Sequence, residues 1–136
     1  MVSLGSWPSS SASMTVPAHP DFVASIRAMT RSMAVLADLA LEDAEALQMA
    51  VDEAAILLLP VIDRHVEETL TAAFEVVDGR VRVALSGRSA AGQDVDRAGL
   101  PWMMLSALDA GVDVQRDGQE LAIAVAISRR REGVLP

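Results

Sequence analysis

Apolar residues along the first half of the chain recur at helical spacing. Two stripes advance in steps of three and four residues, so each covers one face of an amphipathic helix. The first stripe is Phe22, Ile26, Met29, Met33 and Leu36, and the second is Leu47, Val51, Ala54 and Leu58. Asp21 is the candidate N-cap of the first helix, the second begins near Glu42, and Pro60 bends or ends it.

From Leu70 onward the apolar period changes to two, which is typical of half-buried strands. The dipeptides Asp78-Gly79 and Asp117-Gly118 favour tight turns, so they join four strands into two hairpins. Between the hairpins, the stretch from Ser86 to Gly99 is a predicted loop. The stretch from Leu100 to Ala110 is a predicted short helix with Gly111 as its C-cap. The alternating apolar positions are Leu70, Ala72, Phe74, Val76, Val81, Val83, Leu85, Val112, Val114, Leu121, Ile123, Val125 and Ile127.

A short edge strand from Met14 to Ala18 completes the predicted order β, α, α, β, β, α, β, β. Two hairpins with segregated helices predict an α+β fold, a two-layer sandwich of a mostly antiparallel sheet with helices on one face. The domain spans residues 14–131, between a disordered Ser-rich tail over residues 1–13 and a short tail over residues 132–136. Alternatively, the first tail is not disordered but is a docking element anchored by Trp7.

The last strand alternates its large residues with Ala122, Ala124 and Ala126. The large residues belong against the helices, which leaves the alanines on the opposite face. That face is either mildly apolar surface or the contact with a second copy of the chain.

Charge and composition narrow the function. Asp and Glu number 19 against 11 basic residues, all of them Arg, for a formal charge of −8. This balance argues against binding to nucleic acid or to an anionic membrane surface. Cys is absent and only two His are present, His19 and His65, so thiolate chemistry and a multi-histidine metal site are excluded.

The longest apolar run, from Ala54 to Ile62, contains a Pro and falls far short of the ~20 residues that span a bilayer. No signal peptide is visible at the N-terminus. We therefore expect a cytoplasmic protein with no membrane association.

The segment from Leu39 to Leu59, with Ala50-Val-Asp-Glu-Ala54 at its centre, resembles the N-box helix of anti-sigma factor serine kinases of the RsbW type. These kinases belong to the histidine-kinase-like (GHKL) ATPase superfamily. A second match runs from Gly99 to Gly118 and resembles the closing glycine box, helix and hairpin of that family. Divergent actinobacterial stress-response anti-sigma factors look closest. The resemblance covers residues 14–131 and implies the same two-layer fold.

The resemblance implies a site for ATP and Mg²⁺. Glu53 takes the position of the general base, although its catalytic role would be vestigial. The Mg²⁺-ligating Asn of the family is replaced by Leu57, which has no oxygen to offer a hard cation. Gly99 and Leu100 remain from the second glycine box, and Pro101 replaces its second glycine. We therefore expect no protein-derived metal site and a degenerate nucleotide site formed by Glu53, Gly99 and Leu100.

The resemblance also implies partners. Arg27, off the apolar stripe of the first helix, matches the family position that contacts the sigma factor or its antagonist. The leading hypothesis is an anti-sigma factor-like regulator, expected as a homodimer, that binds a sigma factor and is released by an anti-anti-sigma protein with a STAS domain. The alternatives are an active ATP-dependent serine kinase of that STAS protein and a non-catalytic dimerising scaffold.

Several other residues have simpler predicted roles. The cluster from Trp102 to Leu105 is expected in the core rather than at an adaptable binding surface. His19 is expected in a turn, and His65 near the end of the second helix. The three basic residues Arg129, Arg130 and Arg131 are expected to end the last strand in solvent.

Overall fold

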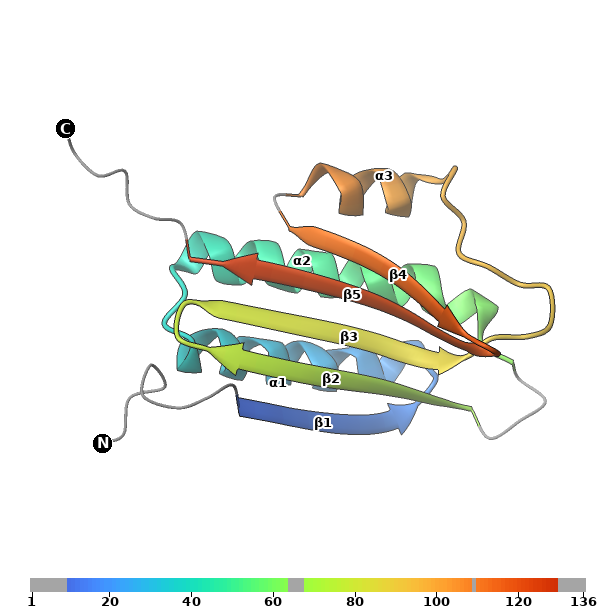
Figure 1. The fold of residues 1–136 in the computed structure, drawn as a ribbon, viewed down its shortest axis with the longest axis horizontal. Helices are drawn as coiled ribbons and strands as arrows, with labels where there is room; N and C mark the ends of the chain where they lie inside the picture. The colour runs from blue at the N-terminus through green and yellow to red at the C-terminus, as the bar shows by residue number, and fades with distance from the viewer. Residues whose placement is uncertain (1–9, 64–67, 109, 130–136) are drawn as a thin grey trace.

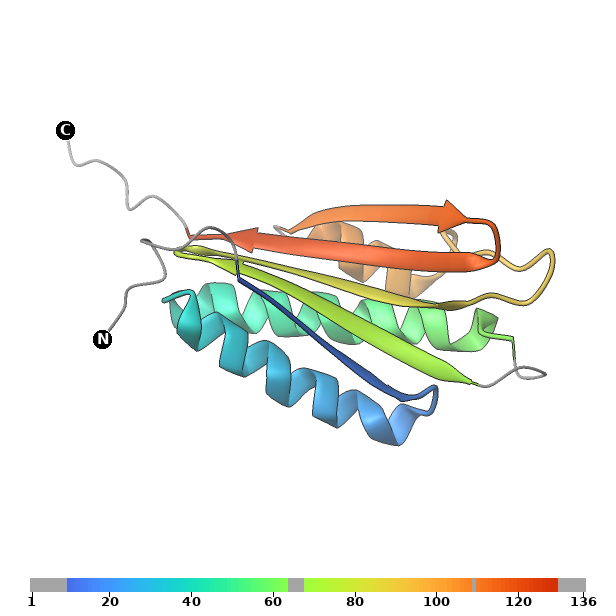
Figure 2. The same cartoon turned by 60° about the horizontal axis from the view of Figure 1, so that its bottom comes forward.

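A computed structural model describes residues 10–63, 68–108 and 110–129. A five-stranded sheet in the order β1-β2-β3-β5-β4, antiparallel throughout, forms one layer, and three α-helices cover one of its faces (Figures 1 and 2). The elements are β1 (Ser10–Pro17), the 3₁₀ helix η2 (Pro20–Phe22), α1 (Val23–Leu36), α2 (Leu41–Leu58), the 3₁₀ helix η3 (Leu59–Val61), β2 (Thr69–Val77), β3 (Arg80–Arg88), α3 (Leu100–Ala107), β4 (Gly111–Asp117) and β5 (Glu120–Ser128). The predicted fold class and element order are confirmed.

The core lies between the sheet and the helices. Residues of alternating position on β2, β3 and β5 are buried, and the register aligns them in rows such as Phe74, Val83 and Val125. All four stripe residues of α2, which are Leu47, Val51, Ala54 and Leu58, are fully buried. The apolar faces of the helices and of the strands, which the two sequence periods predicted, therefore pack against each other in one core.

The first helix faces the core along a different line from the predicted stripe. Ile26 is buried as expected, but Phe22 and Leu36 at the ends are 39% and 52% exposed. Thr30 and Ala34 are buried instead. Thr30 can lie there because its hydroxyl donates to the Ile26 carbonyl at 2.8 Å, which satisfies the buried polar group.

Two predicted helix ends differ from the structure. The N-cap of α1 is Phe22, which makes no side-chain cap, and not Asp21. The chain before α1 turns through η2, whose N-cap is His19, because the His19 Nδ1 accepts the Asp21 N–H at 3.1 Å. The third helix ends at Ala107 with Leu108 as C-cap, so Gly111 is not a cap but the first residue of β4. Asp21 and Gly111 are both residue types that commonly cap helices, but in the structure a different residue occupies each cap position.

The strands are longer than predicted. The first strand begins at Ser10, inside the segment expected to be a tail, because its backbone pairs with β2 from Ser10 opposite Val76 to Pro17 opposite Thr69. Ladder hydrogen bonds join backbones and do not require apolar side chains. The third strand likewise continues through Arg88 instead of ending before Ser86. Residues 1–9, His65, Arg130, Arg131 and the tail at 132–136 lie outside the described residues.

The face of the sheet opposite the helices is built from small and polar residues. Ala73, Ala84 and Ala124 stand in one cross-strand row at its centre. Ala122 and Ala126 are half-buried, while Ala124 is buried. The predicted alanine face therefore exists and points away from the helices. Whether a second copy covers it stays a prediction.

Candidate functional site

The two long helices form a hairpin with a short connection. The last turn of α1 closes with the Ala37 N–H donating to Met33 O and the Leu39 N–H donating to Ala34 O, both at 3.0 Å. Asp38 between them has φ +55°, a left-handed conformation that Asp tolerates better than most residues. The second helix then starts at Leu41, so the N-terminal end of α2 lies beside the C-terminal end of α1.

Polar bridges join the two helices along their length. The Arg27 guanidinium contacts one carboxylate oxygen of Asp52 through both Nε and Nη2, each at 3.1 Å. One turn further on, Arg31 Nε donates to Gln48 Oε1 at 2.9 Å. The Arg27 side chain is 37% exposed, so the residue expected to bind a partner also holds α1 against α2.

A groove of about 520 Å³ lies next to these bridges, between the end of α1 and the start of α2. Its walls are largely apolar, with polar groups at the rim: Arg31, Ala34, Val35, Leu39, Leu41, Ala44, Glu45 and Gln48. Val35 is 79% exposed and Leu41 is 74% exposed. Large aliphatic side chains this exposed, gathered beside a groove, are a typical feature of protein-binding surfaces. We call this area the helix-hairpin face.

The residues expected at a nucleotide site lie on α2 and α3, which pack against each other. Glu53 is half-buried on α2, and Asp52 beside it points to α1 as the partner of Arg27. Leu57, one turn after Glu53, is 5% exposed and belongs to the hydrophobic core. A buried leucine supplies no ligand for Mg²⁺, which requires oxygen.

The start of α3 is poorly suited to hold phosphate. Gly99 is the N-cap and makes no side-chain cap, Leu100 is 65% exposed, and Pro101 has no N–H to donate. The Asp96 carboxylate lies at this end and accepts the Ala98 N–H at 2.9 Å. A carboxylate there repels another anion. These donors and charges do not match the chemistry of a Mg²⁺-ATP site.

Within the described residues, no group of three or more His, Asp or Glu side chains is arranged to hold a metal ion. No helix in that part of the chain is long and apolar enough to cross a bilayer.

One predicted core cluster divides between core and surface. Leu105 is fully buried and Trp102 is packed against the core, as expected. Met103 and Met104 are 61% and 41% exposed, so their assignment to the core is wrong. A helix of only two turns that packs mainly against α2 cannot cover all of its apolar residues.

Neither a protein-family model nor a curated protein sequence matches this chain. Its fold is similar to one seen in a crystal structure of the RsbU and RsbW domains of Rv1364c from Mycobacterium tuberculosis. The superposition has a TM-score of 0.62 at 16% sequence identity and covers 89% of this chain and 33% of that one. The present chain thus spans about a third of the length of the crystallised chain it matches. Fold and comparison together define the class, an α+β sandwich with an RsbW-like fold.

Sequence reasoning missed the groove of the helix-hairpin face. One signal for it was available, because Val35 is an apolar residue off the stripe of α1 and Leu41 precedes the stripe of α2. The role of Arg116, described below, had no such signal, because its partners lie far away in the sequence.

Proposed function

We propose that this protein is a partner-switching regulator that binds a sigma factor and is released by a STAS-domain antagonist. The observation that carries the proposal is the helix-hairpin face, where exposed Val35 and Leu41 flank an apolar groove beside the Arg27–Asp52 pair. The RsbW-like fold supports the same class of partner.

The charge of the chain suits such a partner. A formal charge of −8 favours approach of a basic surface, and a DNA-binding sigma factor offers one. Charge attraction alone does not bury apolar surface, and buried apolar anchors dominate the energy of most interfaces. The groove offers a place for such an anchor. Glu45 at its rim adds a negative charge next to the apolar walls.

We further propose that the protein acts by binding, without phosphoryl transfer. Phosphoryl transfer requires a positioned metal and charge stabilisation. Leu57 and Pro101 stand at two positions where that chemistry needs an oxygen ligand and an amide donor. Glu53 keeps the carboxylate of a general base, so a kinase assay with [γ-³²P]ATP and a STAS protein, on wild type and Glu53→Ala, tests this part. Transfer that is lost in Glu53→Ala would contradict it.

The binding proposal is tested by calorimetry with purified sigma factors and STAS-domain proteins from the source organism. We expect micromolar or tighter binding to one protein of each kind, and competition between them. A Val35→Asp/Leu41→Asp variant should lose at least tenfold in affinity, because it places two charges against the apolar anchor. Met103→Asp, at another exposed apolar position, on α3 and away from the helix-hairpin face, should bind as wild type does.

Two results would overturn the proposal. One is the absence of binding to every sigma factor and STAS protein at micromolar concentration, which would favour the scaffold alternative. The other is binding that Val35→Asp/Leu41→Asp leaves unchanged, which would move the interface away from the helix-hairpin face. Circular dichroism of each variant checks that the fold is retained.

A further inference from the structure

The long connection between β3 and β4 is attached to the rest of the molecule at few points. From residue 89 to residue 110, leaving out residue 109, the only buried residues are Ser89, Val95 and Leu105. Three buried side chains over this length are a small anchor, since local stability follows buried contacts. We call residues 89–108 the strap: an irregular stretch from Ser89 to Gly99 followed by α3.

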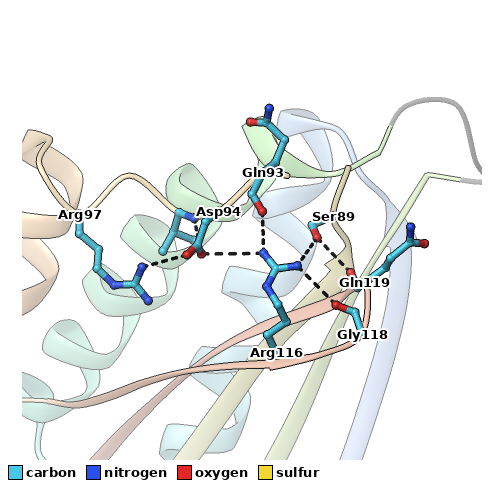
Figure 3. A network of polar contacts seen from close by, with 8 residues as sticks. Ser89, Gln93, Asp94, Arg97, Arg116, Gly118 and Gln119 are labelled. Carbon is cyan, nitrogen blue, oxygen red and sulfur yellow. Dashed lines mark hydrogen bonds and ion pairs between the residues drawn. The ribbon is translucent and has the colours of Figure 1, made fainter. Parts of the chain in front are cut away.

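Arg116 on β4 ties the start of the strap to the sheet (Figure 3). Its Nη1 donates to Ser89 Oγ at 2.8 Å, and its Nη2 donates to the Gln93 carbonyl at 2.6 Å. Nη2 also lies 3.9 Å from a carboxylate oxygen of Asp94. One planar guanidinium therefore contacts three residues of the strap, Ser89, Gln93 and Asp94. The forked guanidinium of arginine allows this geometry, and the single ammonium group of lysine does not.

The anchoring at Ser89 is shared with the turn between β4 and β5. The Ser89 N–H and Oγ both donate to the Gln119 carbonyl, at 2.8 and 3.1 Å. Arg116 itself lies two residues before Gly118 in the same turn. The start of the strap is thus fastened to the end of the β4–β5 hairpin, in addition to the Ala90 N–H bond to Val61 O, and Arg116 supplies the side-chain part of this attachment.

A second set of contacts passes from this point to α3. The Asp94 carboxylate accepts from Arg97 Nη1 at 3.3 Å, and the Arg97 guanidinium stacks over the Trp102 ring at 5.4 Å from its centroid. Trp102 in turn packs against the core. The irregular stretch and α3 are therefore linked to each other as well as to the sheet.

We infer that Arg116 is a latch, and that breaking it lets the strap open as one unit while the sheet and the α1–α2 hairpin stay folded. Opening uncovers the side of α2 against which α3 packs. This gives the fold a second, apolar surface that is concealed while the latch is closed. The inference does not depend on the proposed function, because it concerns the isolated protein.

Hydrogen exchange of the whole chain, read by mass spectrometry at pH 7, tests the latch. Reporter amides include Ser89, bonded to Gln119 O, and Ala90, bonded to Val61 O. In Arg116→Ala we expect exchange across the strap, α3 included, to rise by roughly tenfold, while peptides of β2 and α2 keep their wild-type rates. Arg116→Lys keeps the charge without the fork and should give a smaller rise in the same peptides.

The matched control is Arg82→Ala on β3. Among the described residues, Arg82 makes one long ion pair, 3.8 Å to Glu75, and no hydrogen bond or ion pair to the strap, so its removal should leave strap exchange unchanged. A second readout is the emission of Trp102 in a Trp7→Phe background, where Trp102 is the single tryptophan. Arg116→Ala should shift that emission to longer wavelength.

Several results would overturn the inference. They are strap exchange in Arg116→Ala equal to that of wild type, a rise of the same size in every peptide, or a rise that stops before α3. If Arg116→Ala fails to fold, Arg116→Lys and Ser89→Ala carry the test. Wild-type strap exchange in both of those variants would then reject the latch.

Discussion

Gly87 on β3 lies so close to Ile62, just after η3, and to Thr69 on β2 that there is little room for a side chain. A Cβ added at Gly87 would lie 2.9 Å from Ile62 Cδ1 and 3.3 Å from the Thr69 carbonyl oxygen. The backbone oxygen cannot move without disturbing β2. We expect Gly87→Ala to lower the free energy of unfolding by about 1–3 kcal/mol, the usual cost of overpacking.

Urea denaturation followed by circular dichroism measures that change. Gly111→Ala is the matched control, because a Cβ there meets nothing within 4 Å and Gly111 does not have a positive φ. It should change the stability by no more than about 0.5 kcal/mol. Equal effects of the two substitutions would show that close approach is not what Gly87 provides.

Single residues also show where prediction from the sequence reaches its limit. Alternation correctly placed Phe74 and Leu85 in the core, because side chains of a strand point to opposite faces whatever surrounds them. Val95 has no apolar neighbours of its own period, yet it is buried to 5% exposure. Met104 has apolar neighbours on both sides, yet it is exposed. Their burial depends on residues that are distant in sequence.

Between elements, Arg129 joins three chain segments at one end of the molecule. It follows β5, and its Nη2 contacts Asp78 Oδ1 in the β2–β3 turn at 2.8 Å and donates to Ala37 O after α1 at 3.2 Å. The side chain is 41% exposed, so solvent weakens its ion pair. We expect Arg129→Ala to cost about 1 kcal/mol of stability, chiefly from the lost bond to the Ala37 carbonyl.

Thermal or urea unfolding gives that value, with Arg80→Ala as the control. Arg80 begins β3 next to the same turn and is exposed, and its side chain has no hydrogen bond or ion pair among the described residues. A loss in Arg80→Ala as large as in Arg129→Ala would indicate a general charge effect instead of a link between elements.

Acid should loosen the strap before it unfolds the sheet. The Val95 N–H bonded to the Asp94 carboxylate, helped by Arg97 and Arg116, lowers the pKa of Asp94 below its ordinary value of 3.8. A lowered pKa means that the stabilising contribution is complete above about pH 4 and is lost as the pH falls through the folded-state pKa. Trp102 emission in a Trp7→Phe background should therefore shift to longer wavelength as the pH falls below about 4.

The variant Asp94→Asn tests the negative charge of Asp94 separately from its hydrogen bond to the Val95 N–H. The amide can still accept from Val95, but it no longer attracts Arg97 or Arg116. We expect the variant to show the loosened Trp102 signal already at pH 7 and a smaller change on acidification. An acid transition identical to that of wild type would remove Asp94 as its cause.

Helices and strands were predicted well in their centres and less well at their ends. The stripe of α2 and the alternation of β2, β3 and β5 repeat often enough to identify each element. The end residues were chosen by neighbours: β1 extends to Ser10 because β2 is there to pair with it, and α3 stops at Ala107 before β4 begins. A capping signal in the sequence cannot include such partners.

For the whole molecule, the acidic composition governs behaviour in solution. The formal charge is −8 at pH 7 and the isoelectric point is about 4.6. Repulsion between copies disappears near that pH, so we expect a solubility minimum there. Light scattering across a pH series should rise near pH 4.6 while far-UV circular dichroism keeps its native shape. Flat scattering through that range would contradict the prediction.

The sequence by itself determined the class of fold. Helical and strand periods follow from backbone geometry, which is the same in every protein, and their order leaves an antiparallel sheet with helices on one face as the consistent packing. The residues compared with a nucleotide site, Glu53, Leu57 and Gly99, were identified only through the resemblance of the sequence to RsbW-type kinases.

Only the tertiary structure decided which surfaces the protein presents. It paired Arg27 with Asp52, left Val35 and Leu41 exposed beside a groove, and brought Arg116 to Ser89 and Gln93. Burial and long-range hydrogen bonds depend on what packs against a residue after folding. That information is spread over the whole chain and does not appear in any local pattern.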